Sequence, residues 1–263
     1  MNKLLGLILV VVLGLLPAWA RGQTCETWYP GGEEVPGVGG SIWSLASWDP
    51  DGPGPARARL VACGAFSTTG TTRSDKVAMW NGTSWLQVGS DVNFSSNWPT
   101  RVAVYNNQIV VAGSNLQTPG LVGFHSILRW DGATWQPLGS GVDGAVNAML
   151  EYNGELVVGG TFASAGGVTA NRIARWNGSS WQTLGTGISS GSSVAHMTLF
   201  NGDLIVGGAF TQAGGVAATS IARWNGSTWS SMNNTASTTV GPFATFNGQL
   251  HAASSTAVFR FTG

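Results

Sequence analysis

The chain contains the stretch Trp176-Asn177-Gly178-Ser179-Ser180-Trp181, and this hexapeptide decides the fold because it is one of four copies. The other copies of the pattern Trp-Asn/Asp-Gly-x-x-Trp begin at residues 80, 130 and 224, so successive copies start 50, 46 and 48 residues apart. Each copy ends a longer phrase, which reads AVNAMLEYNGELVVGGTFASAGGVTANRIARWNGSSWQTLG at 145–185 and returns with few changes at 193–232. A nearly fixed period of this length indicates a repeat architecture.

Within one repeat, turn signals separate four short runs with the residue types of β-strands. In the third repeat these runs are residues 146–152, 155–162, 172–176 and 180–184. The pairs Asn153-Gly154 and Asn177-Gly178 predict two-residue hairpin turns, because both residue types tolerate positive φ. A loop of about eight residues, 163–170, joins the second run to the third. Four-stranded units of this length are typical of propeller blades, so we predict an all-β fold.

The sequence pattern of the repeat resembles the kelch motif. An apolar strand is followed by a glycine pair, as at Gly159-Gly160 and Gly207-Gly208, and then by an aromatic residue and Trp-x-x-Leu. The phrase GGxFxxAGGVxAxxIARWNGSxW is similar to exported bacterial kelch-type proteins and to the extracellular propellers of fungal cortical polarity markers. The resemblance covers residues 26–263 and implies a propeller. It does not single out an activity, since such proteins include enzymes, scaffolds and adhesive surface proteins.

Counting repeats predicts a single five-bladed β-propeller over residues 21–263. We expect blades near 42–89, 100–139, 145–185, 193–232 and 241–262. The first repeat is less regular in sequence, and its residues 45–48 are aligned with residues 148–151 of the third repeat. The last repeat lacks a fourth strand, and residues 26–30 have the sequence of one, so we expect this N-terminal segment to close the last blade. The alternative is an open array or fragment that a partner chain completes.

The N-terminus predicts export. Lys3 precedes the apolar run 4–16, and Ala18-Trp19-Ala20 is a small-x-small cleavage signal, so residues 1–20 are expected to be a signal peptide. The alternative is an uncleaved anchor, although the run is shorter than the ~20 residues that span a bilayer. We expect a mature protein without a membrane span, either secreted, periplasmic or at the cell surface.

The amino-acid composition narrows the range of partners that this protein is expected to bind. Charged residues make up 9% of the chain, against about 25% in an average protein, and the net charge is zero. This balance argues against nucleic acid as a partner. Cys25 and Cys63 form a disulfide in one interpretation; in the other they are two thiols, with Cys63 as a small buried residue. We expect a monomer.

Two sets of repeated residues are expected to be structural. The tryptophans should fill the space between blades, where each buries a large apolar area. They are Trp80, Trp85, Trp130, Trp135, Trp176, Trp181, Trp224 and Trp229. The arginines should hydrogen-bond backbone carbonyls between blades; a ring of arginines that binds a ligand is the alternative. They are Arg129, Arg175, Arg223 and Arg260.

The sequence offers few residues or motifs that are typical of metal binding or catalysis. His125, His196 and His251 lack metal-ligand spacing, and neither a Gly-x-Ser-x-Gly elbow nor a Walker loop occurs in the sequence. We therefore predict no metal, no cofactor and no catalytic residue. The prediction is an exported, non-enzymatic binding or surface-structural module with a protein or glycan ligand. The alternative is a carbohydrate-active enzyme, for which Asp91 or Asp143 would be an acidic residue to test.

The binding face is predicted from loop lengths. Short Asn-Gly turns lie on one face of the propeller, so the longer and more variable connections lie on the other, where binding usually occurs. Trp98 has no counterpart in the other repeats and stands near other polar residues. The candidate ligand-binding residues are Asp91, Asn93, Asn97, Trp98, Arg101 and His125. The alternative is that this loop only packs over its blade.

Overall fold

The computed structural model describes residues 38–69, 72–73, 76–89, 98–116, 126–232 and 239–261. All regular secondary structure in these residues is β-strand, and among them no helix could cross a membrane. Several predictions fall outside the described residues. These are the signal peptide 1–20, the closing strand 26–30, Cys25, Asp91, Asn93, Asn97 and His125.

The third repeat folds as a four-stranded antiparallel sheet in chain order. Its strands are β10 (Val146–Tyr152), β11 (Glu155–Gly160), β14 (Ile173–Trp176) and β15 (Trp181–Thr183). The expected loop 163–170 contains a small hairpin of β12 (Ser164–Ala165) and β13 (Val168–Thr169). The strands agree with the alternation of apolar runs and Asn-Gly turns, and the fold is all-β as predicted.

The other repeats build equivalent sheets. The first holds β1 (Val38–Trp48), β2 (Arg59–Thr69), β4 (Val77–Trp80) and β5 (Trp85–Gln87), with β3 (Thr72–Arg73) beside β2. The second holds β6 (Pro99–Tyr105), β7 (Gln108–Gly113), β8 (Ile127–Trp130) and β9 (Trp135–Pro137). The fourth holds β16 (Ser190–Phe200), β17 (Asp203–Ala213), β19 (Ile221–Trp224) and β20 (Trp229–Ser231), with β18 (Val216–Ala217) beside β17. The described part of the fifth has three strands, β21 (Phe243–Phe246), β22 (Gln249–Ala253) and β23 (Val258–Arg260).

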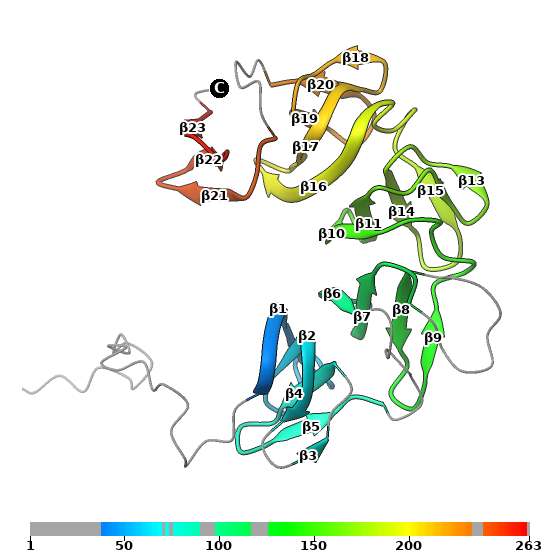
Figure 1. Ribbon diagram of the computed structural model, residues 1–263, viewed down its shortest axis with the longest axis vertical. Coiled ribbons are helices and arrows are strands. Elements are labelled where there is room, and N and C mark those ends of the chain that lie inside the picture. The colour runs from blue at the N-terminus through cyan, green and yellow to red at the C-terminus, as the bar shows by residue number, and fades with distance from the viewer. Residues whose placement is uncertain are drawn as a thin grey trace, which may run out of the picture.

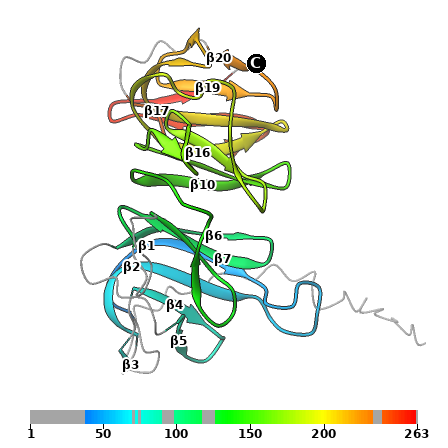
Figure 2. The ribbon, with the colours of Figure 1, turned by 90° about the vertical axis from the view of Figure 1, so that its right-hand side faces the viewer.

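These sheets are the repeated blades of a β-propeller. Figure 1 shows them following one another around an arc, with the first strand of each sheet on the inner side. Figure 2 shows the same sheets stacked in chain order from β1 and β2 to β16 and β17. The first and fifth sheets stand at the two ends of the arc.

The hexapeptide turns are built around one side-chain oxygen. In the third blade, Oδ1 of Asn177 accepts hydrogen bonds from the backbone N–H groups of Ser179 (3.0 Å) and Ser180 (2.9 Å). Asp131 accepts the equivalent pair in the second blade, at 2.8 and 2.7 Å. The bonds from Thr134 and Ala133 lower the pKa of Asp131. The turn therefore requires an acceptor oxygen and not an amide nitrogen.

The second tryptophan of three of the four hexapeptides ties two blades together. The indole N–H of Trp181 donates to the carbonyl of Leu138 in the preceding blade at 2.8 Å. Trp135 donates to Val88 at 3.1 Å, and Trp229 donates to Leu184 at 2.8 Å. A glycine follows each acceptor, and at Gly139, where φ is +58°, an added Cβ would lie 3.0 Å from the ring of Trp176. The repeated spacing Trp-x-x-x-Gly thus leaves room for the next blade's tryptophans.

The repeated arginines have different partners from those predicted. The guanidinium of Arg175 pairs with Glu155 at 3.0 Å, and that of Arg223 pairs with Asp203 at 2.6 Å. Arg129 donates to the side-chain amide oxygen of Gln108 at 3.1 Å. Each of these partners is the first residue of the neighbouring strand of the same sheet, a diagonal cross-strand neighbour. The predicted bonds to carbonyls of another blade are therefore wrong for these three, while Arg260 lies exposed on β23.

A β-bulge at the same place in the innermost strands of the first four blades shifts the predicted alignment of the first blade. Asn147 is the unpaired residue of β10, and Trp43 is the unpaired residue of β1. Ser44 lies opposite Cys63 as Ala148 lies opposite Gly159. The alignment that placed Leu45 on Ala148 is therefore wrong by one residue.

Cys63 is a free and fully buried cysteine. Burial raises the pKa of its thiol to about 12, although Arg101 acts in the opposite direction. As Cys25 lies outside the described residues, the disulfide stays a prediction. If Cys63 is not in that disulfide, its raised pKa favours the protonated, less reactive form of the thiol.

Candidate functional site

Two tryptophans outside the repeated set meet at the junction of the first and second blades. Trp43 is the bulged residue of β1, and Trp98 is the last residue before β6. A bulge redirects a side chain, which brings Trp43 toward the next blade. The two rings lie 5.4 Å apart with an interplanar angle of 52°.

This pair occurs at one junction, although the backbone positions recur. Strand register gives the equivalent positions at the other junctions, and all of them hold small residues. The equivalent pairs are Thr100 with Ala145, Asn147 with Ser193, and Ala195 with Thr239. The scaffold therefore does not need aromatic rings here, and the pair is an addition to it.

Exposure also separates this pair from the structural tryptophans. Trp43 is 40% exposed and Trp98 is 45% exposed. Trp135, Trp181 and Trp229, which fill the spaces between blades, are at most 7% exposed. An exposed aromatic pair is costly to leave in water and is frequent where ligands bind.

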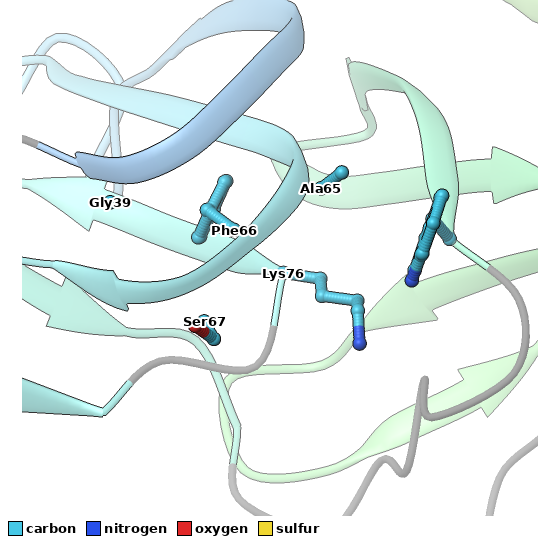
Figure 3. Close-up of a pocket in the computed structure, with 6 residues that line it drawn as sticks. Gly39, Ala65, Phe66, Ser67 and Lys76 are labelled. Atoms are coloured by element: carbon cyan, nitrogen blue, oxygen red, sulfur yellow. The ribbon is translucent and has the colours of Figure 1, made fainter.

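Trp98 lines an open cavity of about 270 Å³ at this junction. The other lining residues are Gly39, Ala65, Phe66, Ser67 and Lys76. Figure 3 shows Lys76 extended from the start of β4, with Phe66 on β2 and Gly39 on β1. The cavity lies at the end of the blade where β2 leads toward β4, which is the face of the longer connections.

Lys76 occupies a backbone position that recurs but a side-chain role that does not. Its φ is +66°, and its carbonyl accepts a hydrogen bond from Gly64 at 3.1 Å. Ser126, Arg172 and Ser220 have the same positive φ and the same backbone bond in the next three blades. Arg172 uses its guanidinium to hold the carbonyl of Ile188 at 3.0 Å, whereas Lys76 lines the cavity.

The Lys76 ammonium has no ion pair with any carboxylate in the described part of the chain. The cavity is thus an aromatic surface beside one positive charge and the exposed hydroxyl of Ser67. Such a site can pack a small ring against an indole and attract an anionic group.

The structure separates two of the predicted binding residues. Trp98 lines the cavity, but Arg101 is not among the lining residues. Nε of Arg101 donates to the carbonyl of Asn147 in the third blade, and Nη1 donates to the carbonyl of Thr100 at 2.8 Å. Arg101 therefore ties the second blade to the third.

Trp43 and Lys76 were not predicted as site residues. Trp43 was hidden because the alignment of the first repeat was shifted at the bulge. Lys76 carried a usable signal, since it is the only lysine after residue 20. A charge of a type used once in a weakly charged chain is a reasonable candidate for a specific role.

Asp143, one of the two acidic residues proposed for a catalytic test, already accepts hydrogen bonds from neighbouring residues. Oδ1 of Asp143 accepts hydrogen bonds from the N–H groups of Ala163 (2.8 Å) and Ser164 (2.9 Å), and Oδ2 accepts from the Ser164 hydroxyl at 2.9 Å. Partial burial alone would raise the pKa of Asp143, but these bonds outweigh it and lower the pKa. Asp143 thus anchors the hairpin of β12 and β13. Within the described ranges, no group of three His, Cys, Asp or Glu side chains could hold a metal ion.

Comparison with known proteins supports the propeller. Residues 153–179 match the family model described as "Domain of unknown function (DUF5122) beta-propeller". No curated protein matches the chain. A crystal structure of the GH74 xyloglucanase from Xanthomonas campestris is similar at 15% sequence identity and a TM-score of 0.37. The alignment covers 82% of this chain and 36% of that one.

Proposed function

We propose that the protein is an exported, non-enzymatic binding module that holds a protein or glycan ligand in the cavity beside Trp98. The carrying observation is the exposed Trp43–Trp98 pair at positions where the other junctions have small residues. Binding sites are often built from a few aromatic groups on a rigid scaffold. Export is supported by the sequence of residues 1–20.

We infer further that the blades form a closed, monomeric five-bladed ring with a kelch-like repeat. Each of the two end sheets exposes an apolar residue whose equivalents in the other blades are buried or partly buried. Leu60 is 39% exposed in the first blade, while Ile109, Leu156, Leu204 and Leu250 at the same position are at most 1% exposed. In the fifth blade Phe246 is 66% exposed, while its equivalents Tyr105 and Tyr152 are at most 7% exposed.

The two exposed faces are complementary halves of one interface. Tyr105 packs in one core cluster with Leu156 of the next blade, and Tyr152 packs in one with Leu204. In a closed ring, Phe246 would meet Leu60 in the same way. The closure buries both faces and leaves no open pair of ends.

The sequence 28–32, Trp-Tyr-Pro-Gly-Gly, supports the proposed closing strand. It matches Trp-Gln-Pro-Leu-Gly at 135–139, where β9 is the outermost strand of its sheet and tolerates Pro137. Trp85 of the first blade has no acceptor carbonyl for its indole among the described residues, unlike Trp135. In the closed ring, the closing strand would supply that acceptor.

A binding survey tests the function. The exported protein and its Trp98→Ala and Trp43→Ala variants are applied to a glycan array and to a pull-down from the native surface. We expect the original protein to bind a ligand in one of these assays. Both variants should bind that ligand with an affinity about tenfold or more lower. Val168→Ala, which removes an equally exposed side chain from the third blade, should bind like the original protein.

Two results would contradict this proposal. The first is a ligand that binds all four proteins equally. The second is turnover of a glycan in a hydrolase substrate panel, with loss of that turnover in Asp91→Asn, which would favour the enzyme alternative.

A further inference from the structure

We infer that the cavity beside Trp98 recognises a carboxylated sugar, that is, a uronic acid residue of an acidic glycan. This inference rests on the proposed function and names its ligand class. The components are an aromatic wall, one cation and one hydroxyl around an open cavity of about 270 Å³.

The size of the cavity favours one ring-sized group. Drug-sized ligands occupy cavities of ≈ 300–1,000 Å³, so this one is suited to a single sugar residue of a chain that continues past the open rim. A pyranose ring has an apolar face that can pack on the exposed indole of Trp98. Trp43 is not among the lining residues, but its ring lies 5.4 Å from that of Trp98 and is tilted at 52° to it, so it packs beside the indole that the sugar would contact.

The polar groups favour a carboxylate. Lys76 contributes a positive charge to the lining, and no carboxylate of the described residues neutralises it. The remaining lining residues, Gly39, Ala65, Phe66, Ser67 and Trp98, are uncharged. An anionic group that enters beside Trp98 therefore meets one cation and no negative charge among the described lining residues, and charge-assisted hydrogen bonds of this kind are among the stronger ones.

A peptide is less well accommodated. Protein anchor sites are fully desolvated pockets surrounded by contacts that exclude water. Here the two indoles stay 40% and 45% exposed, and Ser67 and Gly39 at the rim are also exposed. A partly hydrated site with a hydroxyl and an ammonium matches a polyhydroxylated ring better than an apolar side chain.

The test uses two ligands that share one sugar backbone and differ in whether each carboxyl group is free and charged or methyl-esterified and neutral. Trigalacturonate and its fully methyl-esterified form are titrated into the exported protein by calorimetry. We expect the ester to bind about tenfold more weakly than the acid. Lys76→Met should weaken binding of the acid by a similar factor, and in that variant esterification should have no further effect, because the two changes remove the same contact. Lys76→Arg should restore the difference between acid and ester.

Controls separate this inference from the proposed function and from folding. Arg172→Met removes the cation at the same backbone position of the third blade, so it should leave trigalacturonate binding unchanged even if the melting temperature falls. Lys76 is the only lysine after residue 20, so mass spectrometry after mild acetylation should show that trigalacturonate protects this single side chain.

Three outcomes would overturn the inference. If acid and ester bind equally and both depend on Trp98, the carboxylate is not recognised, although the module still binds a glycan. If polyaspartate competes as strongly as trigalacturonate, the site is a general anion site or a peptide site. If trigalacturonate does not bind while another ligand from the survey depends on Trp98, the ligand class is wrong and the proposed function stands.

Discussion

At the scale of single residues, His196 shows how the inner strands of neighbouring blades constrain each other. Its ring lies against Gly241 of the next blade, where an added Cβ would come within 2.4 Å of it. Burial lowers the pKa of His196, and the positive charge of Arg101 lowers it further. The folded protein therefore favours the neutral imidazole.

This pKa shift predicts that stability decreases in mildly acidic solution. A group whose pKa is lower in the folded state than in the unfolded state stabilises the fold above its unfolded pKa, and this contribution is lost as the pH falls. For His196 the loss begins near the ordinary value of 6.5 and continues down to its lower folded pKa. Asp131 and Asp143 also have lowered pKa values, so their contributions are lost only below the ordinary carboxyl range.

The measurement is the free energy of unfolding in urea between pH 7.5 and pH 5. We expect it to decrease with falling pH, and we expect a smaller decrease in His196→Gln. His251→Gln is the matched control, because His251 is involved in an exposed side-chain contact on β22 and should not change the pH dependence. Equal slopes for the original protein and His196→Gln would show that another group is responsible.

At the scale of strands and blades, the contact between a tryptophan and the preceding blade can be tested at one atom. Trp181→Phe keeps most of the apolar ring but removes the N–H that donates to Leu138. The carbonyl of Leu138 is then left without this partner in a buried place, which costs about 1–3 kcal/mol. Urea denaturation should show this loss, whereas Gln182→Ala on the exposed side of the same strand should change stability by less than about 0.5 kcal/mol. A loss as small as that of the control would mean that the bond contributes nothing to stability.

Strands and turns were predictable because their signals are local. Alternating apolar residues and Asn-Gly pairs define β10, β11 and the turn between them without reference to the rest of the chain. The bulge at Asn147 and Trp43 has no such signal, since it depends on how two inner strands fit together. One unpaired residue reverses the faces of the strand that follows, and this is why Trp43 was missed as a partner of Trp98.

The partners of the arginines were unpredictable for a related reason. Periodicity places Arg175 on the face opposite Trp176, but it does not say which neighbour can reach it. Glu155 lies two residues along the adjacent strand, so an acidic or amide side chain there is closer than any carbonyl of another blade. For the site, Trp98 could be found from the sequence because it breaks the repeat. Lys76 stands out as the only lysine after residue 20, but its place in the site could be assigned only once the cavity was known.

At the scale of the whole molecule, the decisive question is whether the ends of the arc meet. In the first four blades, an aromatic residue at the end of the innermost strand contacts the following blade. Trp48 donates its indole N–H to the carbonyl of Asn107 at 2.9 Å, and Tyr105 donates its hydroxyl to the carbonyl of Gly154 at 3.2 Å. Phe200 meets Phe261 edge to face at 6.3 Å. Phe246 is the last member of this series, and the first blade is the surface it would meet.

A double-mutant cycle between the two ends tests the closed ring. If Phe246 packs on Leu60, the costs of Phe246→Ala and Leu60→Ala are not additive, and the coupling free energy is about 0.5–3 kcal/mol. If the ring is open, the two side chains are far apart and the costs add within about 0.5 kcal/mol. The control cycle pairs Leu60→Ala with Phe200→Ala, which acts on the fifth blade and should be additive.

Repeating the urea titrations at tenfold higher protein concentration separates the two ways in which the ends can be covered. Coupling that does not change with concentration means that the chain closes on itself, and coupling that grows with concentration means that the end of one copy packs on the beginning of another. Trp85→Phe adds an independent measurement. In the closed ring, this substitution should lower the free energy of unfolding by about as much as Trp181→Phe. A negligible decrease would mean that the Trp85 indole has no acceptor and that the ring is not closed.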